Sequence, residues 1–186
     1  KKPFSCALLI IIMVIGFALA GTIQVSAEAP GIIVVISSDK VWTKADSPYT
    51  LTGPLFVSNG ATLTIDAGVA VDLNGYYITV NGTLVAVGTS SERIQIINGE
   101  RLEFTEFSSG WNEQTGSGCI IEEAYIACRV YSTVSLKLNA CSLPSGVTVG
   151  DLSIIVGCEI GGNVEAGRSL TLSDSSVSGT LNALDS

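Results

Sequence analysis

The carboxylates are the first residues to test for chemistry, because two facing carboxyl groups can hydrolyse a glycosidic bond and a dense cluster can bind calcium. Glu122 and Glu123 are adjacent, so on a strand they would point to opposite faces. Hydrolysis needs a facing pair about 5–10 Å apart in a cleft. Asp66 and Asp72 do not belong to the dense Asp-x-Asp run of a calcium loop. We therefore expect solvated surface acids, with no catalytic residue and no metal ligand.

The absence of histidine narrows the chemistry further. Without imidazole, a Ser–His–Asp set cannot form, and most zinc and copper sites are excluded. The sequence also contains no glycine-rich phosphate-binding loop. We predict that the protein is not an enzyme and that it binds no cofactor.

Four cysteines lie in the second half of the chain: Cys119, Cys128, Cys141 and Cys158. An even number is compatible with disulfides in an exported protein. The repeat described below stacks Cys141 on Cys158 with β-carbons about 4.8 Å apart, slightly beyond the usual disulfide range. Small buried thiols that fill a narrow column are at least as consistent with the pattern. We assign no bridge, and the missing Cys-x-x-Cys spacing argues against a zinc site.

The N-terminus has the order of a secretory signal peptide, which we assign to residues 1–27. Lys1 and Lys2 precede an uncharged apolar run over 7–20, and small residues allow cleavage after Ala27. An uncleaved membrane anchor is the alternative, although a bilayer span needs about 20 apolar residues. In both cases we expect the remainder to be secreted or at the cell surface, with membrane contact only through residues 1–27 if they are retained.

The remaining composition favours an acidic all-β protein. Removal of Lys1 and Lys2 leaves seven basic and 17 acidic residues, a net charge of −10, which disfavours binding to nucleic acid. Gly, Ser, Thr and Val are plentiful, and no long stretch has the apolar period of a helix.

A repeat of 17 residues begins at Gly118 and is the strongest structural signal. Its aliphatic columns are Ile121, Leu138, Ile155 and Leu172; Ile126, Leu143, Ile160 and Val177; and Val130, Val147, Val164 and Leu181. A column of small residues is formed by Ala124, Cys141, Cys158 and Ser175. Neighbouring coils of a solenoid lie about 4.8 Å apart, so each column predicts a stack of side chains inside the coils.

The first half follows a related pattern with longer coils. Residues 59–65 reappear as 81–87, 22 residues later. We therefore predict three segments after the signal peptide: an irregular cap over 28–50, about 22-residue coils over 51–117 with a projecting loop near 108–117, and 17-residue coils over 118–186. Trp42 and Tyr49 would cover the first coil.

These patterns predict a single-stranded parallel β-helix, that is, a β-solenoid. The sequences PLFVSNGATLTIDAGV (54–69) and ITVNGTLVAVGT (78–89) resemble the opening coils of secreted pectin-lyase-like β-helices, over about 42–98. IGGNVEAGRSLTLSDSSVSGTLNA (160–183) resembles the bactofilin repeat, over about 143–184. The resemblance implies a right-handed helix and, for bactofilin, end-to-end polymers. Two features depart from these families: bactofilins usually lie inside the cell, and the acidic and basic site of pectate lyases has no counterpart.

For function we predict an extracellular or cell-surface structural solenoid that can self-assemble through its ends. The first alternative is a carbohydrate-binding or carbohydrate-processing module, with Trp111, Tyr125 and Tyr131 as glycan contacts. The second is a passive spacer within a longer surface protein. The expected partners are accordingly another copy of the chain, a glycan or a component of the cell envelope.

Overall fold

The computed structural model describes residues 32–184. The predicted signal peptide, residues 1–27, lies outside the described residues. Apart from one 3₁₀ turn, Lys44–Asp46 (η1), the regular elements of the described part are all β-strands. No helix in this part is long and apolar enough to cross a membrane.

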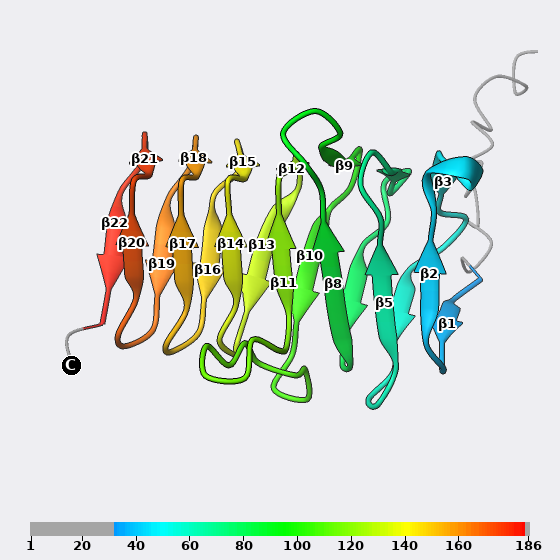
Figure 1. Ribbon diagram of the computed structural model, residues 1–186, viewed down its shortest axis with the longest axis horizontal. Helices are drawn as coiled ribbons and strands as arrows, with labels where there is room; N and C mark the ends of the chain where they lie inside the picture. The colour runs from blue at the N-terminus through cyan, green and yellow to red at the C-terminus, as the bar shows by residue number, and fades with distance from the viewer. Residues whose placement is uncertain (1–31, 185–186) are drawn as a thin grey trace, which may run out of the picture. The chain divides into compact units, whose positions relative to one another are not determined.

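The strands form three parallel sheets that share the same coils (Figure 1). The first sheet contains β1 (Val34–Ile36), β4 (Leu55–Val57), β7 (Ile78–Val80), β10 (Arg101–Phe104), β13 (Arg129–Ser132), β16 (Val147–Val149), β19 (Val164–Ala166) and β22 (Leu181–Ala183). The second contains β2 (Lys40–Trp42), β5 (Thr62–Ile65), β8 (Thr83–Val87), β11 (Ile120–Glu122), β14 (Lys137–Asn139), β17 (Ile154–Val156) and β20 (Thr171–Ser173). The third contains β3 (Tyr49–Thr50), β6 (Ala70–Asp72), β9 (Ile94–Ile97), β12 (Ala124–Ile126), β15 (Ser142–Leu143), β18 (Glu159–Ile160) and β21 (Ser176–Val177).

Successive strands in the chain therefore belong to successive sheets, and each strand pairs with the strand three places before it in the chain. This topology confirms the predicted all-β parallel solenoid. The right-handedness implied by the family resemblance stays a prediction.

The apolar side chains that point inward form one continuous core. In the first sheet, Leu55 pairs with Ile78, Ile78 with Leu102, and Leu102 with Val130, and all four are fully buried. Alternation along each strand turns the intervening residues outward. The core therefore consists of stacks that run from coil to coil, and no coil encloses a core of its own.

The 17-residue repeat corresponds to one coil. Ile121 pairs with Leu138, Leu138 with Ile155, and Ile155 with Leu172. Two further in-register columns are Val130, Val147, Val164 and Leu181, and Leu143, Ile160 and Val177. Ile126 lies in β12, which pairs with β15. Burial decreases along the chain, from fully buried Leu138 to Leu181, which is 48% exposed.

The longer coils do not keep the 22-residue spacing suggested by the sequence. That spacing would place Leu63 next to Val85, but Leu63 pairs with Leu84. The turn 58–61 before β5 is two residues longer than the turn 81–82 before β8, so the repeated Asn-Gly pairs lie at different positions in their turns. A shift of one residue exchanges inward and outward faces, and Leu84 is the buried one.

The described part of 28–50, for which we expected an irregular cap, forms a complete coil of β1, β2 and β3. β1 pairs with β4, β2 with β5 and β3 with β6. These strands have only two or three residues each, too few for alternation to be visible in the sequence. Trp42 stacks on Tyr49 with ring centroids 4.6 Å apart, and Trp42 is buried.

Candidate functional site

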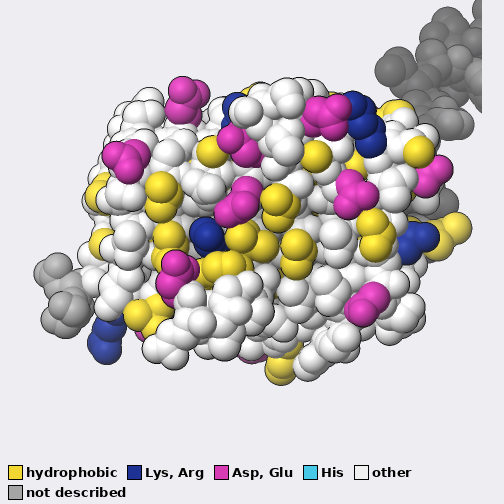
Figure 2. Space-filling view, viewed as in Figure 1, with side chains coloured by type: hydrophobic (Ala, Val, Ile, Leu, Met, Phe, Trp, Pro, Cys, Tyr) yellow, Lys and Arg dark blue, Asp and Glu magenta, His cyan; other side chains and the backbone are white. Residues whose placement is uncertain are grey.

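A shallow groove of about 590 Å³ lies on the second sheet beside the loop 105–119, which joins β10 to β11. Its lining includes Thr62, Thr83, Val85, Trp111 and Ile120. Apolar side chains are interspersed with polar and charged ones over this face of the molecule (Figure 2). The groove could therefore contact a ligand that has both hydroxyl groups and apolar faces.

The loop beside the groove is tied to the coils on both sides. The backbone N–H of Ser109 donates to the Gly82 carbonyl at 2.9 Å, and the backbone N–H of Trp111 donates to the Ser135 carbonyl at 2.8 Å. The Trp111 ring lies 4.7 Å from the Lys137 ammonium, measured to the ring centroid. One face of the indole is therefore covered by a cation, which leaves less of the ring free to stack on a ligand.

The three aromatic residues predicted as glycan contacts lie on three different sides of the solenoid. Trp111 borders the second sheet, whereas Tyr125 belongs to β12 of the third sheet and is 40% exposed. Tyr131 belongs to β13 of the first sheet, where its hydroxyl accepts a hydrogen bond from Arg129 at 3.0 Å. The structure does not bring these rings together, so they cannot form one platform for a sugar chain.

The adjacent carboxylates Glu122 and Glu123 are held by different cations. Glu122 lies 3.5 Å from the Lys137 ammonium, and Glu123 lies 3.9 Å from Arg93. Between residues 32 and 184, no group of three or more Cys, Asp or Glu side chains is placed to hold a metal ion. Glu122 and Glu123 therefore each take part in an ion pair.

All four cysteines of the described part are buried free thiols. Burial raises the pKa of Cys119 to about 11, from an ordinary value of 9.0. Burial likewise raises the pKa of Cys128 to about 11. These two thiols are therefore protonated and poor nucleophiles at neutral pH.

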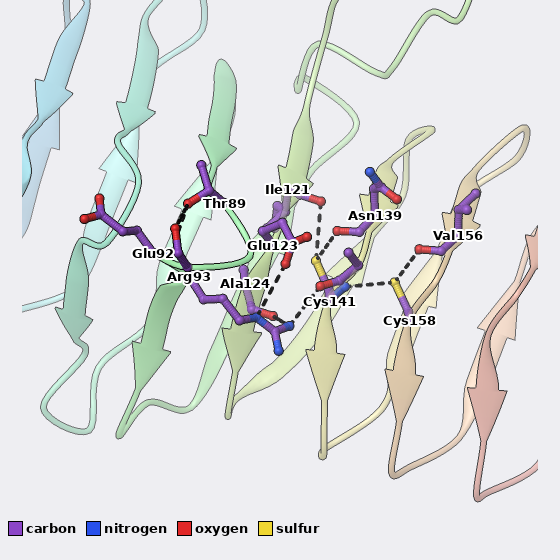
Figure 3. A network of polar contacts seen from close by, with 12 residues as sticks. Thr89, Glu92, Arg93, Ile121, Glu123, Ala124, Asn139, Cys141, Val156 and Cys158 are labelled. Carbon is purple, nitrogen blue, oxygen red and sulfur yellow. Dashed lines mark hydrogen bonds and ion pairs between the residues drawn. The ribbon is translucent and has the colours of Figure 1, made fainter.

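Cys141 and Cys158 form a contacting pair, which we call the cysteine pair (Figure 3). The Cys141 N–H donates to the Cys158 sulfur at 3.4 Å. The Cys141 thiol donates to the Ile121 carbonyl at 3.4 Å, and the Cys158 thiol donates to the Val156 carbonyl at 3.3 Å. The side-chain hydrogen bond between the two cysteines raises the pKa of Cys141 and lowers the pKa of Cys158.

The remaining members of the small-residue column continue this arrangement. The Cys158 N–H donates to the Ser175 hydroxyl at 3.0 Å. At the other end, Ala124 is fully buried, and its carbonyl accepts a hydrogen bond from Arg93 at 3.0 Å. The column is thus a series of small side chains that fit close to the backbone of the neighbouring coil.

Two residues whose side chains form hydrogen bonds between neighbouring coils were not identified from the sequence. Ser153 is fully buried, and its hydroxyl accepts the Leu136 N–H at 3.0 Å; its 17-residue distance from Leu136 was the available signal. Arg93 donates to the Ala124 and Ala140 carbonyls at 3.0 and 2.8 Å, and so links two coils (Figure 3). No spacing signal marks Arg93, because it lies between the regular elements.

Comparisons with protein-family models, with curated proteins and with solved structures find no match to this chain.

Proposed function

We propose that this chain is an exported structural solenoid that forms a rigid module on the outside of the cell. The observation that carries the proposal is the unbroken parallel pairing of three sheets around one apolar core. In a fold of this kind the coils support one another, and backbone groups are paired from coil to coil. A rigid module of this kind suits a mechanical or spacing role.

The chemistry of the site supports a structural role over catalysis. The carboxylates are engaged in ion pairs with Lys137 and Arg93, and Cys119 and Cys128 are protonated at neutral pH because burial raises their pKa. Export rests on the signal-like order of residues 1–27. Both considerations favour a surface module without catalytic activity.

Protease treatment of intact cells tests the proposed location. An epitope placed in the exposed loop tip 112–117 should be lost when intact cells are treated with protease, while a cytoplasmic marker is retained. Because the coils are tightly paired, a core fragment that contains the 17-residue coils should survive. An epitope that is cleaved only after lysis would contradict export.

End-to-end assembly is the second candidate role. From β11 onward, successive coils keep the same three-strand cross-section and the same register, so two copies meeting at their ends could continue the three sheets. The resemblance of residues 160–183 to bactofilin repeats favours this form of assembly. Electron microscopy of the purified chain at rising concentration should show filaments with a repeat of about 4.8 Å along the axis. Monomers alone at high concentration would contradict assembly but leave the structural role intact.

Glycan binding is a weaker candidate that only the groove beside Trp111 supports. A glycan array should then give signals that Trp111→Ala abolishes and Tyr125→Ala, on another face, leaves unchanged. Equal signals for both variants would exclude the groove as the binding site.

A further inference from the structure

The cysteine pair joins two neighbouring coils at a position that the register fixes on both sides. Asn139 pairs with Val156 just before the two cysteines, and Ser142 pairs with Glu159 just after them. Cys141 and Cys158 must therefore lie directly opposite each other. Paired strands are about 4.8 Å apart, which falls within the Cα separation of about 4.4–6.8 Å seen in disulfides.

The two side chains also lie in the same buried column, each with its sulfur turned towards the coil before it. The Cys158 sulfur lies 3.4 Å from the Cys141 nitrogen, and each sulfur lies close to the carbonyl two residues before it, at 3.3 Å in both cases. Both residues are 1% exposed. Both sulfurs are therefore confined to one narrow column. A bond between them requires the Cys141 side chain to turn from the Ile121 carbonyl towards Cys158, and the two β-carbons to approach to about 4.5 Å or less.

The other two cysteines of the described part have no such neighbour. The Cys119 sulfur accepts the Leu84 N–H at 3.5 Å, and the residue one repeat after it is Leu136. Cys128 follows β12, and the residue one repeat after it is Ser145. The stacking of two thiols is thus specific to Cys141 and Cys158.

We infer that Cys141 and Cys158 form a disulfide that links two neighbouring coils when the chain folds in an oxidising compartment. The inference rests on the proposed export, because cytosolic thiols are kept reduced. The oxidant is a low-molecular-weight or protein disulfide, present outside the cytoplasm.

The reaction is a thiol–disulfide exchange in two steps. While the coils are assembling and the thiols are accessible, the thiolate of one cysteine attacks the oxidant, forms a mixed disulfide and releases one thiol. The second cysteine, brought opposite by the register, then displaces the other half of the oxidant. The two cysteines lose two protons and two electrons to form one S–S bond, and the oxidant disulfide is reduced to two thiols.

The consequence is a covalent link between the residues that immediately precede β15 and β18, two neighbouring strands of the third sheet. It closes a loop of 17 residues, which restricts the unfolded chain. It also fixes the register between the two linked coils. These coils precede β20 to β22, whose residues are partly or fully exposed. The oxidised chain should therefore melt about 5 °C or more above the reduced chain.

Peptide mapping of the refolded full chain tests the link without any cell. The reduced chain is refolded with a mixture of reduced and oxidised glutathione, denatured, alkylated, and digested with trypsin and an Asp-specific protease. Cleavage after Lys137 and Arg168 and before Asp151 gives peptides 138–150 and 151–168, each with one cysteine. We expect these peptides to be recovered mainly as one linked species, which separates on reduction.

Serine variants test whether the linked peptides and the higher melting temperature depend on this pair of cysteines. Cys141→Ser should abolish both the linked species and the rise in melting temperature, whereas Cys128→Ser, also buried, should retain both. Separate alkylated peptides from correctly folded wild-type chain, or a link from Cys141 to another cysteine, would overturn the inference. Because the assay is done on purified protein, its failure leaves the proposed export untouched, and a cytoplasmic location would refute export without affecting this result.

Discussion

At the scale of single residues, the same type of side chain contributes very differently to stability on the inward and outward faces of a strand. Val130 is fully buried in β13, where it pairs with Leu102 and Val147, whereas Val87 in β8 points outward and is 40% exposed. Val130→Ala removes two buried methyl groups and leaves a cavity, so it should lower the free energy of unfolding by about 2 kcal/mol. Val87→Ala is the matched control and should change it by about 0.5 kcal/mol or less. Denaturant titration measures both, and equal losses would mean that the two faces are not distinguished as described.

The buried thiols give the stability a dependence on pH. The pKa of Cys119 is about 11 in the folded chain and 9.0 when unperturbed, so the unfolded chain loses this proton first. The contribution of the protonated Cys119 thiol to the free energy of unfolding is complete below about pH 9 and is lost as the pH rises towards 11. Over this window each such thiol should make the free energy of unfolding fall by about 1.4 kcal/mol per pH unit.

The variant Cys119→Ala isolates this contribution, because every other ionisable group is the same in both proteins. Its free energy of unfolding should fall less steeply than that of the wild type between pH 9 and 11. Parallel pH profiles for the two proteins would show that Cys119 ionises equally in the folded and unfolded chains.

At the scale of elements, the turns are constrained by the coil next to them. Gly60 and Gly146 have nearly the same backbone, with φ of +80° and +83°, but a β-carbon at Gly60 would meet no atom within 4 Å. At Gly146 it would lie 2.5 Å from the Asn163 carbonyl oxygen of the next coil.

This pair separates backbone strain from crowding between coils. Gly60→Ala should cost about 1 kcal/mol, from the positive φ alone. Gly146→Ala should cost about 2–4 kcal/mol, because the neighbouring turn must also move. Thermal or denaturant unfolding of both variants measures the difference, and similar losses would mean that the turns are not in close contact.

The elements also show which parts of the fold the sequence could predict. Stacking of Ile121, Leu138 and Ile155 follows from the 17-residue spacing, because coils of constant length keep equivalent residues in phase. The longer coils vary in turn length, so the match of 59–65 to 81–87 was wrong by one residue in register. The bridge from Arg93 to the Ala124 and Ala140 carbonyls joins residues with no periodic relationship, and only the folded coils bring them together.

At the scale of the whole molecule, each coil of the solenoid is stabilised by its neighbours. Within the described residues, coils in the middle pair on both sides, and their inward residues, such as Ile121 and Leu138, are fully buried. In β20 to β22, Leu172 and Val177 are only partly buried and Leu181 is 48% exposed. Stability in such stacks is close to a sum of nearest-neighbour terms, so it should decline from the middle coils towards β20 to β22.

Hydrogen exchange of the reduced full chain, followed by peptide mass spectrometry, would resolve this gradient. Amides of β7 to β14 should exchange most slowly, because they open only when most of the stack unfolds, and amides of β20 to β22 should exchange first through local opening. Val130→Ala should speed exchange in the middle coils, while the outer coils, already opening locally, should change little. Uniform exchange from β4 to β22 would show instead that the coils unfold as a single cooperative unit, and the nearest-neighbour description of this solenoid would have to be abandoned.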